Sequence, residues 1–206
     1  MRIKFTIAAI MLFAFVSSAF AAKPAPPPHI PNSVCIDPGH GGSDAGTSNQ
    51  GLTEKDVNLQ VANILRGKLE TAGHIVFMTR ETDIALSNSD RYNFCNSEKA
   101  AVLISIHHNG SSSSATDYSQ ALYMKKSDVL LAQKVVNSVS STLGIQNGGI
   151  SRFASGVLLK ANMPAAISEG FFLTNTDEYN YLTTGSDRLN QEAQAIFNAI
   201  NSYFGN

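Results

Sequence analysis

The feature of this chain that most constrains its fold is a repeated alternation between short apolar segments and longer amphipathic ones. Residues 33–37 (SVCID), 74–79 and 101–106 (AVLISI) are expected strands, and apolar side chains recur at helical spacing between them. The run 101–106 is apolar without interruption, which is typical of a strand covered on both faces. Strands separated by helices predict a single α/β domain with a central, mostly parallel sheet flanked by helices.

The boundaries of the expected elements follow from end signals and apolar stripes. The first helix is expected to begin at Thr53, where Thr53 and Asp56 fit a capping box, and to be closed by Gly73. The other expected elements are helices over residues 89–98, 128–143 and 189–204, an edge strand at 121–124, and short strands at 156–159 and 165–168.

The first 32 residues are expected to lie outside the folded domain. An apolar run at 7–16 follows the basic residues Arg2 and Lys4 and precedes small residues, which predicts a signal peptide over residues 1–21. A membrane-spanning helix would need about 20 apolar residues. Residues 22–32 hold five of the seven prolines and predict an extended tether, so the catalytic domain is expected over residues 33–206.

Charge and cysteine content limit the partners and the compartment. Removal of residues 1–21 takes away two of the 15 basic residues and none of the 16 acidic ones, which leaves a formal charge of −3. No dense run of Lys or Arg remains, so we expect no nucleic-acid partner. Because the apolar run at 7–16 is expected to be removed with the signal peptide, we also expect no stable membrane anchor in the mature chain. For Cys35 and Cys95 two interpretations stay open: a disulfide formed in an oxidising compartment, or two buried thiols.

Four residues suited to metal binding or acid–base chemistry lie at the ends of expected elements. His40 follows the strand 33–37 in a glycine-rich turn, and Glu54 lies in the first turn of a helix. His107 and Glu169 each come directly after an apolar strand. Two histidines and a carboxylate are a recurring catalytic zinc set, and a second carboxylate can accept a proton from the attacking water. Without two ligands on one helix, the same residues also fit an interpretation as turns and caps.

The signature blocks of the zinc-dependent N-acetylmuramoyl-L-alanine amidases resemble four segments of this chain: IDPGHGGSDAGT (36–47), GLTEKDVNL (51–59), SIHHN (105–109) and NMPAAISEGFFLTN (162–175). The chain is similar to the amidase type 3 catalytic domain over nearly the whole expected domain. The resemblance implies a sheet of about six strands, one zinc ion bound by His40, Glu54 and His107, and Glu169 as the general base. It also implies hydrolysis of the amide between N-acetylmuramic acid and L-alanine in bacterial peptidoglycan, in cell-wall remodelling or lysis.

The expected partner is therefore peptidoglycan, and the expected location is the periplasm or the extracellular cell wall. We expect a monomer, and the sequence leaves open whether a protein activator is needed. Two alternatives remain: another zinc hydrolase that cuts wall peptides with the same residues, and a non-catalytic wall-binding module.

Four further positions could support the site without being ligands. His108 departs from the family pattern; adjacent strand residues point to opposite sides, so only one of His107 and His108 should face the metal, and the pattern favours His107. Asp37 is expected to be a turn residue or to orient His40. Arg80 and Arg91 are expected in structural salt bridges.

Overall fold

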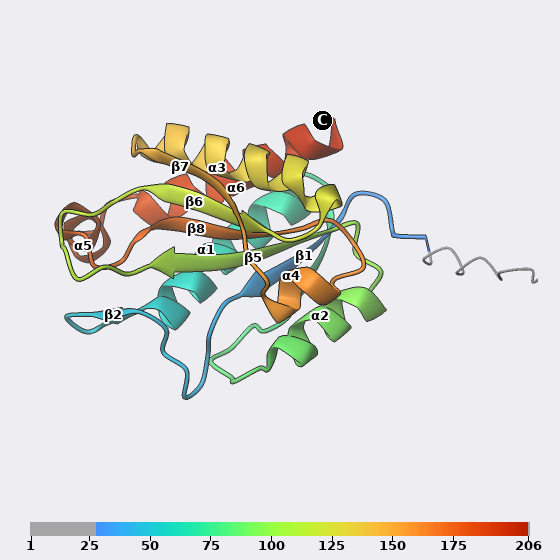
Figure 1. Cartoon of the computed structure of the whole chain (residues 1–206), viewed down its shortest axis with the longest axis horizontal. Helices are drawn as coiled ribbons and strands as arrows, with labels where there is room; N and C mark the ends of the chain where they lie inside the picture. Colours follow the sequence, from blue (N-terminus) through green and yellow to red (C-terminus); the bar gives the residue numbers. More distant parts are fainter. Residues whose placement is uncertain (1–27, 206) are drawn as a thin grey trace, which may run out of the picture.

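Six strands form the central sheet of the computed structural model, which describes residues 28–205 (Figure 1). Every neighbouring pair is parallel except β8 with β6, so the predicted mostly parallel α/β sheet is confirmed. In spatial order the strands are β4 (Ile75–Met78), β1 (Ser33–Pro38), β5 (Val102–Asn109), β8 (Ala165–Phe172), β6 (Ser119–Tyr123) and β7 (Asn147–Arg152). The expected signal peptide and the first part of the expected tether lie outside the described residues.

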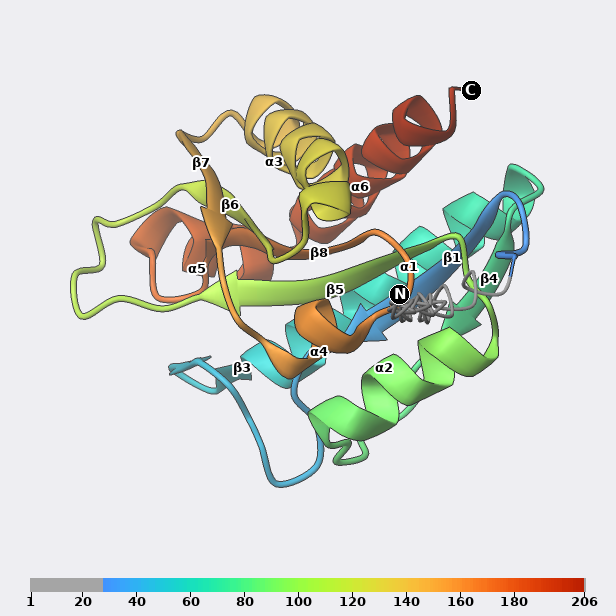
Figure 2. The same cartoon turned by 45° about the vertical axis from the view of Figure 1, so that its right-hand side comes forward.

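Helices cover both faces of the sheet (Figures 1 and 2). One face carries the long helices α1 (Glu54–Thr71), α3 (Val129–Leu143) and α6 (Arg188–Phe204). The other face carries the shorter α2 (Asn88–Ser97) and α4 (Gly156–Lys160). The remaining elements are the hairpin of β2 (Ser48–Asn49) and β3 (Leu52–Thr53), the 3-10 turn η1 (Lys126–Asp128), and α5 (Thr176–Thr183).

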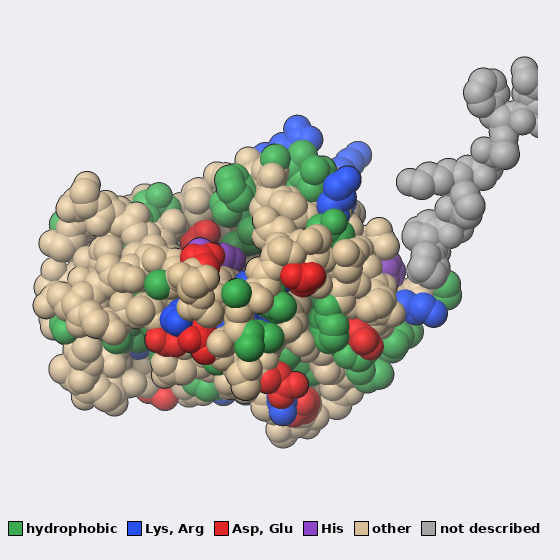
Figure 3. Space-filling model, turned by 90° about the horizontal axis from the view of Figure 1, so that it is seen from below, with side chains coloured by type: hydrophobic (Ala, Val, Ile, Leu, Met, Phe, Trp, Pro, Cys, Tyr) green, Lys and Arg blue, Asp and Glu red, His purple; other side chains and the backbone are tan. Residues whose placement is uncertain are grey.

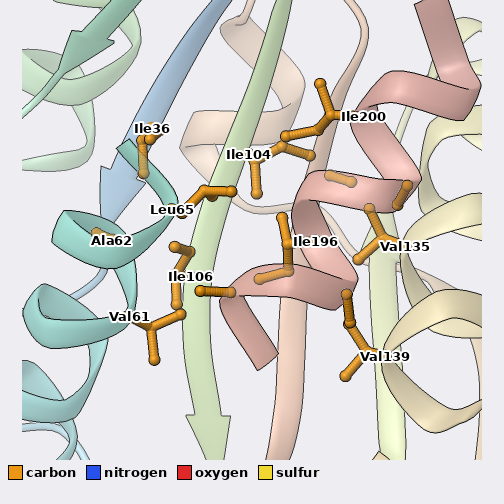
Figure 4. Close-up of a cluster of buried hydrophobic side chains, with 14 of the residues drawn as sticks. Ile36, Val61, Ala62, Leu65, Ile104, Ile106, Val135, Val139, Ile196 and Ile200 are labelled. Atoms are coloured by element: carbon orange, nitrogen blue, oxygen red, sulfur yellow. The ribbon is translucent and has the colours of Figure 1, made fainter. Parts of the chain in front are cut away.

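The larger core lies between the sheet and the three long helices. Ile104 and Ile106 of β5 are fully buried, and they lie between Leu65 of α1 and Ile196 of α6 (Figure 4). The apolar run at 101–106 is buried because alternate side chains serve the two opposite cores. Burial of each such side chain contributes about 1.5–3 kcal/mol, so this layer fixes the strands that hold the site.

The smaller core lies beneath α2 and α4 and contains a disulfide. Cys35 of β1 and Cys95 of α2 are bonded at 2.06 Å, which decides between the two interpretations of these cysteines. Leu103 and Ala165 pack in the same cluster. Because α2 and α4 are short, this face of the sheet stays partly uncovered toward the carboxyl ends of its parallel strands.

The strand predicted at 156–159 is wrong. These residues belong to α4, where the Ser155 side chain accepts from the Leu158 amide and Val157 and Leu158 are buried against the sheet. A short apolar run fits a buried helix turn as well as a strand. The segment 121–124 is not an edge strand either, because β7 pairs with its outer side; the polar sequence of β7 gave no strand signal.

The capping box predicted at Thr53 is also wrong. The Thr53 hydroxyl bonds the Asp56 carboxylate, and the first amides of α1 donate to the carbonyl oxygens of Thr47 and Ala45 instead. The helix still ends as expected, with Gly73 at φ +85°. Among the described residues, none of the helices has the length and apolar character that crossing a membrane requires.

Candidate active site

The first site residue lies in a tight turn that follows β1. His40, Gly41 and Gly42 all have positive φ, at 58°, 132° and 59°. Two glycines adopt such angles without strain, whereas a histidine does so at a cost, so the surrounding structure must hold it there. We call residues 38–42 the His40 turn.

Three donor side chains converge beside this turn. Glu54 opens α1, and its Oε1 lies 3.1 Å from Nε2 of His40 and 3.0 Å from Nδ1 of His107 on β5. One donor atom from each of the three residues lies within 4.8 Å of the others. The structure therefore brings His40, Glu54 and His107 together, although they lie on three separate elements.

The three side chains fit a divalent metal ion. Donors on one tetrahedral zinc lie roughly 3.3 Å apart for bonds of about 2.0–2.1 Å. Glu54 Oε1 lies 3.1 and 3.0 Å from the two histidine nitrogens, which is close to that separation. Asp44 contacts Nδ1 of His40 at 2.9 Å, which directs Nε2 toward Glu54. The hydrogen bond to Glu54 raises the pKa of His40 to about 9 although burial opposes it, so metal binding would displace a proton.

Two glycines allow the donors to approach one another. A Cβ at Gly39 would lie 2.2 Å from the His107 ring, and one at Gly46 would lie 2.4 Å from the Glu54 carboxylate. Any side chain at either position would occupy space that the donor groups now use. Gly39 was expected only as part of the glycine-rich turn, and Gly46 and Asp44 were not singled out from the sequence. Glycines and an acid in the loop that follows a metal-capable histidine were the available signal.

Glu169 lies next to this cluster. It pairs with His107 in the register of β8 and β5, so both side chains point to the same face of the sheet. Burial raises the pKa of the Glu169 carboxyl; the charge of His107 opposes the rise and that of Glu54 adds to it. A raised pKa makes this carboxylate a better proton acceptor near neutral pH.

The cluster opens into a groove of about 460 Å³. Its floor is the uncovered part of the sheet, and its walls are the start of α2 and the segment from β7 to α4. Phe153, 52% exposed, lies on the second wall. Histidine and acidic side chains lie side by side on this face, with hydrophobic side chains nearby (Figure 3).

Asp37 lies within β1 and is not a turn residue, and it has no hydrogen bond to His40. It is buried, and it accepts from Thr79, Ser105 and Arg91 at 2.6–2.8 Å. Burial alone would raise its pKa, but Arg91 and the two hydroxyls hold it below the ordinary value. The expected salt bridge of Arg91 is thus confirmed with Asp37 as partner, whereas Arg80 bonds four carbonyl oxygens and no carboxylate.

His108 points away from the cluster, as alternation along β5 requires. It is buried and bonds Glu192 at 2.9 Å and Asn58 at 2.7 Å. Burial would lower its pKa, but the Glu192 carboxylate raises it overall. His108 therefore links β5 to α6 and α1, and its amide donates to Glu54.

Comparison with known proteins identifies the family of the chain. Residues 34–202 match the family Amidase_3, N-acetylmuramoyl-L-alanine amidase. The chain belongs to this amidase family. It is accordingly a hydrolase of the class that cleaves bacterial cell-wall peptidoglycan.

Individual members of the family align over most of the chain. N-acetylmuramoyl-L-alanine amidase LytC of Bacillus subtilis is 30% identical over 181 residues, which cover 86% of this chain and 36% of LytC. The germination-specific N-acetylmuramoyl-L-alanine amidase of the same organism is 31% identical over 95% of this chain and 90% of its own length. The crystal structure of N-acetylmuramoyl-L-alanine amidase from Clostridium difficile 630 superimposes with a TM-score of 0.79 at 34% identity, over 85% of this chain and 97% of that one.

Proposed function

We propose that this chain hydrolyses the amide bond between the lactyl group of N-acetylmuramic acid and L-alanine with one zinc ion held by His40, Glu54 and His107. The observation that carries the proposal is the convergence of these three donors in an open groove beside Glu169. Membership in the amidase family supports the choice of bond.

A zinc ion supplies Lewis-acid chemistry at such a site, because it lowers the pKa of water to about 7 and polarises a carbonyl oxygen. The chain supplies the geometry. The Glu54 carboxylate is oriented by the amides of Thr47 and His108, and the His40 ring is oriented by Asp44. The groove beside the three donors leaves space in which the scissile carbonyl would lie next to them.

Glu169 moves the proton in this proposal. Its carboxylate accepts the proton of the attacking water and then delivers it to the departing amine of L-alanine. The raised pKa suits both steps, since the group must hold the proton between them.

The test is mass spectrometry of peptidoglycan fragments after incubation with the purified protein, with and without a chelator. We expect stem peptides that carry a free L-alanine amine, no product with the chelator, and recovery when zinc is restored. Cuts within the peptide would instead favour a wall peptidase, and zinc-independent release would refute the metal assignment.

We further propose that residues 1–21 direct export, that residues 22–32 tether the catalytic domain, and that the protein works as a monomer in the periplasm or the cell wall. The Cys35–Cys95 disulfide supports an extracytoplasmic location, because such bonds persist in oxidising compartments. Sequencing the N-terminus of the exported protein tests the cleavage site, and light scattering tests the monomer. Comparing purified protein with and without cell-wall extract tests the need for an activator.

A further inference from the structure

The carbonyl oxygens of the His40 turn are held almost entirely by side chains from elsewhere in the fold. The oxygens of Pro38 and Gly39 each accept from Arg80 at 2.9 Å, and that of Pro38 also accepts from Arg91 at 2.8 Å. The oxygen of His40 itself accepts from Arg91 at 2.8 Å.

The rest of the turn is held in the same way. The oxygen of Gly42 accepts from Lys55 at 2.9 Å, and that of Gly41 accepts from the amide of Asp44. Five consecutive carbonyl oxygens, at 38–42, are therefore all bonded, four of them by cationic side chains.

The three cations come from separate elements: Arg80 follows β4, Arg91 lies on α2, and Lys55 lies on α1. The two arginines are only 2% and 5% exposed. Burying a guanidinium is costly unless its donors are all used, and the nitrogens of Arg80 are used on main-chain carbonyls alone. Arg80 thus bonds only main-chain carbonyl oxygens, and two of them belong to the His40 turn.

The fixed backbone of the turn determines the direction of the His40 ring. Its positive φ is unfavourable for a residue with a side chain, and such a conformation persists only when its surroundings over-determine it. With its carbonyl fixed by Arg91 and its ring fixed by Asp44, Nε2 of His40 can face only Glu54.

We infer that Arg91, Arg80 and Lys55 are positioning residues that hold the His40 turn in its left-handed path and thereby preset a ligand of the metal. The inference rests on the proposed metal role of His40. It predicts that loosening one carbonyl of the turn weakens metal binding although no ligand is changed. Outer partners of metal ligands typically affect affinity by about 10–100-fold.

Arg91→Lys separates this role from a purely structural one. Arg91 uses one terminal nitrogen for Asp37 and Pro38 and the other for His40. A lysine has a single nitrogen, so it keeps the buried positive charge beside Asp37 and gives up the carbonyl of His40. Lys55→Gln removes a partly exposed contact to Gly42 and is the second variant.

The matched control is Arg66→Lys, because Arg66 bonds Glu70 and Glu81 at the protein surface. For the full chain and each variant, the zinc dissociation constant is measured by competition with a chromophoric chelator. The visible spectrum of the cobalt-loaded protein, kcat and KM separately, and the melting temperature of the metal-free protein are also recorded.

We expect Arg91→Lys to bind zinc about 10–100-fold more weakly, with an altered cobalt spectrum and a loss in kcat rather than KM. Lys55→Gln should shift in the same direction, and Arg66→Lys should match the wild type. Wild-type zinc affinity and a wild-type cobalt spectrum in both variants would overturn this inference and leave the metal assignment intact. If Arg91→Lys does not fold, the Lys55→Gln result decides. If the wild type takes up no metal, the metal assignment fails and the inference falls with it.

Discussion

Gly39→Ala tests whether the close approach of the His40 turn to His107 is required for function. The added methyl carbon would lie 2.2 Å from two atoms of the His107 ring, whereas ordinary contact begins at 3.4 Å, so about 1.2 Å of relief is needed. The backbone of Gly39 cannot supply it easily: its amide donates to Ile106 and its carbonyl accepts from Arg80 and Asn58. We therefore expect the His107 ring to move.

Such a movement is large for a metal ligand, since bond lengths in metal sites vary by only about 0.2 Å. A misplacement of about 1 Å in a reacting group costs on the order of 100-fold in rate, which is about 2.7 kcal/mol. We expect Gly39→Ala to lose about 100-fold in amidase turnover and at least 10-fold in zinc affinity. Turnover is followed by the appearance of free L-alanine amines, and metal content by mass spectrometry.

Gly67→Ala is the control. Gly67 lies within α1 and has open space around its Cα, so alanine there should stabilise the helix by up to about 1 kcal/mol and leave turnover unchanged. A Gly39→Ala protein with wild-type metal content and turnover would refute the argument, because the ring would then have room that the structure does not show.

Three other perturbations have defined outcomes. Glu169→Gln keeps the shape of the side chain and removes the proton acceptor, so turnover should fall by about 10²–10⁴-fold with zinc content unchanged; lost zinc would contradict a role in proton transfer. Replacing both Cys35 and Cys95 by alanine removes a cross-link between residues 60 positions apart, so the unfolded chain gains conformational freedom. The free energy of unfolding, measured by urea titration, should fall by about 4 kcal/mol. An unchanged urea midpoint would argue against the bond. Asp37 has a lowered folded pKa, so its contribution to stability is complete above about pH 4 and is lost as the pH falls through the folded value. Asp37→Asn should therefore lower the free energy of unfolding by about 3–5 kcal/mol near neutral pH, because it leaves the charge of Arg91 unpaired. The stability of this variant should fall less steeply in acid than that of the wild type. Parallel curves of stability against pH would contradict the assignment.

Elements whose pattern of apolar residues reflects their burial could be predicted from the sequence. The strand at 101–106 and the helix that Gly73 closes were predictable because continuous burial and helical periodicity are local properties. By contrast, β7 is a polar edge strand, and the apolar turn of α4 is too short to reveal its period. The segment that joins these two elements forms a wall of the groove together with the start of α4, so the shape of the groove was not predictable.

The same division holds for the site. The sequence by itself determined which residues could do the chemistry, because His40, Glu54, His107 and Glu169 lie in characteristic segments at the ends of expected elements. Only the tertiary structure decided which partner each polar group finds. Asp44, not Asp37, contacts the ring of His40, and Cys35 meets Cys95 across 60 positions. These choices depend on strand order and on the packing of α2 against β1, which bring distant segments together and leave no local trace in the chain.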